Sequence, residues 1–124
     1  MEYLYLLAND SFALRAVKYL NQMPQLPVKF ITVIHLNNGW VFRVKMSSPL
    51  NSYLSKNLSA FLAEMGAPYQ PPLRVRIALW SLEAGESPII VRRRYQVTVI
   101  YHGSLNGNEI EAFRYQLIQE LSVD

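Results

Sequence analysis

Three segments of the chain alternate a buried-type residue with a polar or charged one: residues 40–46, 73–79 and 91–101. Because the side chains of a β-strand point alternately to opposite faces, each segment predicts a strand with one apolar face and one polar face. The last two of these strands are expected to cover residues 73–80 and to run from residue 89 or 90 to residue 101.

Two further strands are predicted earlier in the chain. Residues 3–8 are apolar, and residues 28–36 are rich in β-branched side chains, which favour strands. Asn37-Asn38-Gly39 separates the second strand from residues 40–46, and an Asn-Gly pair supplies the positive φ angles of a tight hairpin turn. The second and third strands are therefore expected to pair with each other.

Three segments predict helices. The first is capped within residues 9–11 and runs to about residue 22. The second begins at Ser48-Pro49, a hydroxyl cap followed by proline at the first helical position, and ends at Gly66. The third begins near residues 106–108. The predicted buried stripes are Ala13, Ala16, Val17 and Leu20 in the first helix; Leu50, Leu54, Leu58, Phe61, Leu62 and Met65 in the second; and Ile110, Phe113, Leu117 and Leu121 in the third.

The order of elements is β-α-β-β-α-β-β-α, and 124 residues are enough for one α+β domain spanning residues 1–124. The first six elements match the split pattern of ferredoxin-like folds. Right-handed crossovers would place both early helices on one face of a mainly antiparallel five-stranded sheet. The fifth strand would then lie beside the fourth at an edge, and the last helix would cover more of the same face. The opposite face would be left open.

The predicted open face is basic, because the apolar rows of the strands must face the helices, which places Trp40 and Phe42 in the predicted core. Half of the twelve Lys and Arg residues would stand on it. Glu2 stands at the start of the chain, and the other eight acids fall in loops, predicted helices or the C-terminal tail, so carboxylates within the middle and late strands would not neutralise this row. An anionic ligand, acids from a loop or helix, or water and salt would have to offset the repulsion. The predicted anion-binding residues are Arg43, Lys45, Arg74, Arg76, Arg92 and Arg94.

This face predicts a small non-enzymatic binding module for an anionic partner, with nucleic acid or another polyanion as the first expectation. If Leu4 and Leu6 point to the helices, then Tyr3 and Tyr5 point to the open face, where bases could stack on them and on Trp80. One alternative is an assembly protein, a homodimer or a subunit of a larger complex, which the 51% hydrophobic composition favours. A less favoured alternative is an enzyme acting on a phosphorylated or carboxylated small molecule.

Candidate chemistry beyond binding is sparse. The chain has no cysteine, which fits a cytoplasmic protein and leaves no thiolate site. His35 and His102 each end a predicted strand, and two histidines without a patterned acid make a poor metal site. Asp10 is best explained by helix capping. The apolar start is too short to span a membrane. We therefore expect no catalytic residues, no metal site and no cofactor.

Overall fold

The computed structural model describes residues 1–105, 111 and 113–115. It is an α+β structure built on a five-stranded sheet in which all neighbouring strands are antiparallel, as predicted. The order across the sheet is β4-β1-β3-β2-β5. The strands are β1 (Glu2–Leu7), β2 (Val28–Leu36), β3 (Gly39–Met46), β4 (Gly66–Pro68) and β5 (Thr98–Gly103), and the helices are α1 (Asp10–Asn21), α2 (Ser52–Ala63), α3 (Leu73–Glu83) and α4 (Pro88–Tyr95).

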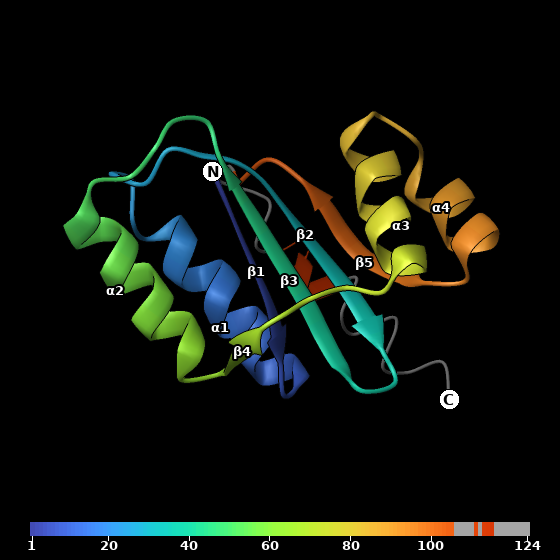
Figure 1. The fold of residues 1–124 in the computed structure, drawn as a ribbon, viewed down its shortest axis with the longest axis horizontal. Helices are drawn as coiled ribbons and strands as arrows, with labels where there is room; N and C mark the ends of the chain where they lie inside the picture. Colours follow the sequence, from blue (N-terminus) through green and yellow to red (C-terminus); the bar gives the residue numbers. More distant parts are fainter. Residues whose placement is uncertain (106–110, 112, 116–124) are drawn as a thin grey trace.

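Helices lie on both sides of the sheet. Figure 1 shows α1 and α2 on one side and α3 with α4 on the other. Two groups of buried apolar residues correspond to these two interfaces. The first joins α1 and α2 to the sheet and includes Ala16, Val17, Leu58, Leu62, Ile31, Val33, Phe42 and Val44. The second joins α3 and α4 to the opposite face and includes Ile34, Val41, Val75, Ala78, Leu79, Leu82 and Val91.

Both faces of the central strand β3 are covered by helices. Trp40 and Phe42 pack into the group beneath α1 and α2, which confirms their prediction as core residues. Val41, on the other face, packs beneath α3 and α4. The expectation that one sheet face is open is therefore wrong for the centre of the sheet.

The predicted fourth strand, residues 73–80, is wrong, because this segment forms helix α3. Its buried residues Val75, Ala78, Leu79 and Leu82 are spaced by three, one and three positions, which places them on one face of a helix. A different set in the same segment, Leu73, Val75, Ile77 and Leu79, satisfies a two-residue alternation, although Leu73 is 64% exposed in the structure. The segment alone therefore fits both periods, and only continuation to Leu82 separates them.

The predicted fifth strand is wrong over its first half, because residues 88–95 form helix α4. Ser87 caps this helix by accepting a hydrogen bond from the Ile89 N–H at 3.2 Å, and Pro88 stands at its first position. Arg92-Arg93-Arg94 occupy its last turn, where the helix dipole favours cations. The helix ends at Gln96, whose φ of 55° lies in the left-handed region. Only Thr98–Gly103 is a strand, and it pairs with β2 at the far edge of the sheet from β4.

Helices α1 and α2 agree better with the sequence-based prediction than the later elements do. Asn9 caps α1 by accepting from the Phe12 N–H at 2.9 Å, and all four residues of the predicted stripe are buried. Helix α2 begins later than predicted, because Asn51 rather than Ser48 is its cap and accepts from the Leu54 N–H at 2.8 Å.

Gly66 does not close α2 but begins β4, a three-residue strand that the sequence did not indicate. A side chain there would stand 2.0 Å from the Leu6 carbonyl oxygen, so only glycine permits this approach to β1.

Most of the predicted last helix, including its start at residues 106–108 and its stripe residues Ile110, Leu117 and Leu121, lies outside the described residues. Glu111 and residues 113–115 are described, and they are helical. Phe113 is buried in the group that includes α1 and α2, and its ring meets Tyr101 edge-on with centroids 6.3 Å apart.

Candidate functional site

The six predicted anion-binding cations do not share a sheet face. Arg43 and Lys45 lie on β3, whereas Arg74 and Arg76 lie on α3. The remaining two, Arg92 and Arg94, lie on α4. The predicted basic sheet surface is therefore replaced by two groups: a pair of cations beneath α3, and a set of arginines on the helices that cover them.

Arg43 is buried, with 3% of its surface exposed, and is held by two carboxylates. Its Nε donates to Glu2 Oε2 at 2.6 Å, and its Nη2 donates to Glu83 Oε1 at 2.6 Å. A longer contact of 3.5 Å joins Nη1 to the carbonyl oxygen of Leu79 on α3, and the Phe30 ring centroid lies 5.3 Å from the guanidinium carbon. Burial opposes the charge, but the hydrogen bonds and charges of both glutamates outweigh it and raise the Arg43 pKa.

Glu83 also accepts a hydrogen bond from Lys45, so one carboxylate near the end of α3 joins two cations of β3. The hydrogen bond from Lys45 lowers the Glu83 pKa, partial burial works the other way, and Arg43 lowers it further. Of the three offsets expected for the basic row, acid from a helix is the one present here. Arg43 and Lys45 are thus already paired within the protein.

The predicted stacking residues also separate. Tyr3 and Tyr5 point to the helix side rather than to an open face, because Tyr5 is buried in the group beneath α1 and α2 and the Tyr3 hydroxyl lies 2.8 Å from Ser55 Oγ on α2. The orientation predicted for these two tyrosines is wrong. Trp80, on α3, is 57% exposed and is the predicted stacking residue that faces solvent.

The chain's excess of positive charge lies in α3 and α4. Residues 73–95 contain five arginines and two glutamates, which gives a formal charge of +3, the same as that of the whole chain. One of these glutamates, Glu83, is directed at the sheet and paired with Arg43 and Lys45. The exposed arginines of the two helices are Arg74, Arg76, Arg92, Arg93 and Arg94.

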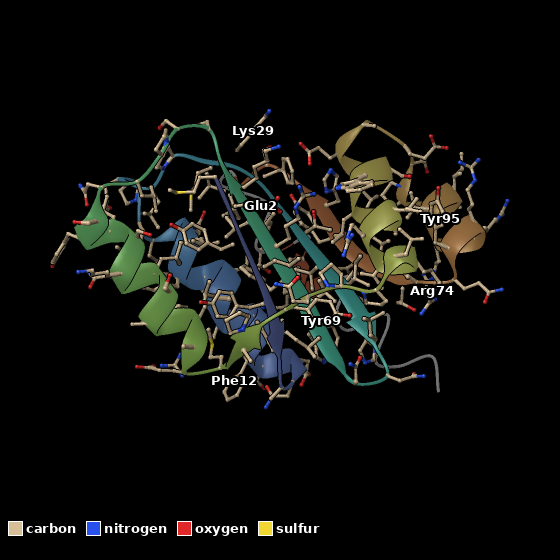
Figure 2. The ribbon with its side chains drawn as sticks, in the orientation of Figure 1. Glu2, Phe12, Lys29, Tyr69, Arg74 and Tyr95 are labelled. Carbon is tan, nitrogen blue, oxygen red and sulfur yellow. The ribbon has the colours of Figure 1, made fainter. Side chains whose placement is uncertain are left out.

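Arg74 has a structural role among these arginines. Its Nη1 donates to the carbonyl oxygens of Tyr95 and Gln96 at 2.9 and 2.8 Å, which satisfies acceptors at the end of α4. Figure 2 shows Arg74 beside Tyr95. Helix α4 makes a second contact with α3 through the Tyr95 hydroxyl, which lies 3.2 Å from Ser81 Oγ. The two helices are therefore fastened to each other at more than one point.

A groove of about 320 Å³ lies between α3 and β1, and β3 and the segment that leads into α3 complete its lining. Leu4 and Arg43 come from the sheet, and Trp80 and Arg76 come from α3. Figure 2 shows Glu2, on β1, and Tyr69, just after β4, between the α1–α2 pair and α3. The groove is lined by Glu2, Leu4, Arg43, Tyr69, Gln70, Pro71, Arg76, Leu79 and Trp80.

A larger hollow of about 500 Å³ lies beside α1 and includes Arg15, Lys18, Tyr19 and Phe61. Its two rings already stack on each other with centroids 3.9 Å apart, and Arg15 lies 5.7 Å from the Phe61 ring centroid. The two rings and Arg15 thus contact one another, and we place the candidate site on α3 and its groove rather than here.

His35, His102 and Asp10 do not line the groove between α3 and β1. His102 Nδ1 is 2.7 Å from Thr32 Oγ1, and burial, followed by the charge of Arg43, lowers its pKa. The His35 ring stacks on Trp40 with centroids 4.1 Å apart. Asp10 occupies the first turn of α1. Within residues 1–105, 111 and 113–115, no three His, Cys, Asp or Glu side chains gather in a way that could hold a metal ion.

The comparisons with known proteins give no relative: no family model, no curated protein and no solved structure matches the chain. Among the described residues, no helix combines the length and apolar character needed to cross a membrane.

Proposed function

We propose that the protein is a non-enzymatic binding module that contacts an anionic partner, with nucleic acid as the first choice, through the exposed arginines of the α3–α4 pair. The observation that carries this proposal is the placement of the whole formal charge of +3 within residues 73–95. Arg43 and Lys45, which were the sequence-based candidates on the sheet, act in this proposal as internal anchors for α3.

The fold supplies a rigid support for such a surface. Strand order β4-β1-β3-β2 within a β-α-β-β-α-β sequence of elements is the arrangement expected for a ferredoxin-like core. We infer that α3, α4 and β5 are additions to that core. The additions cover the sheet face on which the predicted basic row would have stood.

Phosphate binding suits arginines presented in this way. A guanidinium offers several N–H donors in a planar fork that matches phosphate oxygens. Each phosphate contact releases condensed counterions, so affinity falls steeply as salt rises. Arg76 and Arg93 serve as the test residues because both are exposed and neither joins α3 to α4 in the way Arg74 does.

The test is a titration of a labelled oligonucleotide at several salt concentrations, with the Arg76→Ala, Arg93→Ala double variant. Loss of each phosphate contact is expected to reduce the salt slope by about one. The matched control is Lys29→Ala with Lys56→Ala, which removes the same charge from exposed positions on β2 and α2. Equal loss of affinity in both double variants would show that binding depends on net charge and not on the α3–α4 surface. Affinity that does not change with salt concentration would contradict the proposal.

Exposed apolar side chains favour a second candidate, an assembly protein. Leu73 and Trp80 on α3 are 64% and 57% exposed, and Ile89 on α4 is 64% exposed. Large exposed apolar side chains mark many protein interfaces. Light scattering over a range of protein concentrations tests this candidate. A dimer that persists at high salt and is lost in Ile89→Ser would support it, and a monomer at all concentrations would count against it.

A further inference from the structure

We propose that the groove between α3 and β1 receives one unpaired nucleobase, so that the partner of this module is single-stranded nucleic acid. This inference rests on the proposed function and specifies its ligand. It is carried by the juxtaposition of an exposed tryptophan, a tyrosine, an arginine and a carboxylate around one groove of about 320 Å³.

Trp80 provides the stacking surface. Helix α3 buries Val75, Ala78, Leu79 and Leu82, and Trp80 lies beside that face with 57% of its surface exposed. A large aromatic side chain left in this position forgoes the free energy that burial would provide. Stacking of a base on an aromatic side chain contributes about 1–3 kcal/mol and tolerates any base, because every base has a π-face.

The rest of the groove can recognise the edge and the backbone of a nucleotide. Glu2 is 45% exposed at its side chain and keeps acceptor capacity beyond its bonds to Arg43, and carboxylates accept hydrogen bonds from amino groups such as cytosine N4. Arg76 is exposed where it lines the groove; its Nη2 donates to the Pro71 carbonyl oxygen at 3.3 Å, and a guanidinium has further N–H donors for a phosphate. The volume falls within the range of small ligand sites.

A base paired in a duplex is stacked between its neighbours and cannot enter such a groove without being flipped out at a cost of a few kcal/mol. A single strand avoids that cost, because its bases are free to turn outward. The inference therefore predicts selection of single-stranded over double-stranded nucleic acid by the same protein. The arginines of α4 alone would not provide this selection, since both forms carry phosphates.

The experiment uses the full chain and about 12-nucleotide probes, a length within the span of single-strand sites. The probes are a deoxycytidine oligomer, an abasic oligomer with the same phosphates, and the deoxycytidine oligomer paired to its complement. Tryptophan emission provides a local readout, because Trp40 is only 5% exposed beneath α1 and α2 whereas Trp80 lines the groove. We expect the deoxycytidine oligomer to quench Trp80 and to bind more tightly than the other two probes.

Trp80→Leu keeps an apolar side chain and is expected to weaken binding of the deoxycytidine oligomer about 5- to 150-fold, the equivalent of one lost stacking contact. Leu73→Ala is the matched control, since Leu73 is equally solvent-facing on α3 but does not line the groove. It should leave affinity unchanged. Urea unfolding midpoints of both variants establish that each is folded.

Two outcomes overturn the inference in different ways. Equal binding of all three probes with unchanged tryptophan emission would contradict base binding in the groove but would remain consistent with the proposed anionic partner. Absence of binding to every probe at low salt would overturn both. In that second case, quenching or a blue shift of Trp80 emission that grows with protein concentration would assign the exposed tryptophan to contact with a second copy of the chain.

Discussion

Glu83 on α3 accepts a hydrogen bond of 2.6 Å from Arg43 on β3, a residue 40 positions earlier in the chain. The same carboxylate accepts a bond from Lys45. One acidic side chain thus pairs with two cations of the sheet and fastens the helix above them, while Glu2 supplies the second negative charge. This relationship explains why positively charged residues can stand on a covered sheet face.

We predict that Glu83→Ala lowers the free energy of unfolding by about 1–3 kcal/mol, because it leaves buried Arg43 with one fewer carboxylate. Urea unfolding followed by circular dichroism measures the change. Glu86→Ala is the control: Glu86 lies 3.9 Å from Arg94, whose side chain is 57% exposed, and such a surface pair contributes at most about 1 kcal/mol. Equal effects of the two substitutions would contradict the anchoring role of Glu83.

The same pairing predicts a loss of stability in acid. Lys45 and Arg43 hold the Glu83 pKa below its ordinary value, so folding favours the carboxylate. The corresponding stabilisation is complete above the unfolded pKa of about 4.3 and is lost as the pH falls through the lower folded pKa. Urea midpoints from pH 7 to pH 3 should show the wild type and Glu83→Gln converging at low pH. A constant difference between them across this range would be the contrary result.

Gly66→Ala should destabilise the edge of the sheet. The added Cβ would lie 2.0 Å from the Leu6 carbonyl oxygen, which is backbone and cannot turn aside, so β4 must move away from β1. We expect a cost of about 2 kcal/mol or more, in line with overpacking of a close contact. Gly103→Ala is the comparison, because its nearest atom, 3.0 Å away, is the hydroxyl end of Tyr101. Thermal unfolding of both variants should place Gly66→Ala well below Gly103→Ala.

Arg74→Ala should loosen α4 without touching the sheet. It removes the donor to the carbonyl oxygens of Tyr95 and Gln96, and we expect a loss of about 1–2 kcal/mol in unfolding free energy. Arg93→Ala, at an exposed position on α4, should change stability by less than about 0.5 kcal/mol. If both substitutions have the same small effect, the bonds from Arg74 do not hold α4.

The sequence predicted the fold well as far as about residue 65 and poorly beyond it. The β2–β3 hairpin, the cap before α1 and the core positions Trp40 and Phe42 all follow from local signals, and all are confirmed. Within the hairpin turn, the positive φ expected of the Asn-Gly pair is present at Gly39 but not at Asn38. Residues 73–80 carried two compatible periods. The signals that separate them, a helical spacing that continues to Leu82 and a Ser87-Pro88 helix start, lie at or beyond the segment's end.

The wrong strand assignment beyond residue 65 also explains why the predicted site residues do not lie together. Assigning strands to residues 73–101 placed six cations on one surface, and correct assignment of α3 and α4 separates them. The burial of Arg43 had a signal in Glu2, the acid directly before the first predicted strand, which lies on β1 next to β3. Its second partner, Glu83, could not be found from sequence, because the docking of α3 onto β3 is a long-range event. The roles of Trp80 and the arginines in binding stay predictions.

Because α3 and α4 cover one face of the sheet, they protect the folded protein from aggregation. Beneath them the sheet presents Leu4, Leu6, Ile34 and Val41. If the helical pair detached while the sheet stayed intact, this apolar face would open to water as a template for aggregation. Hydrogen exchange at the amides of α3 would report the frequency of such openings. Substitutions in α3 and α4 would then be limited by the need to keep the two helices attached to the sheet, above all through Glu83, as well as by any partner.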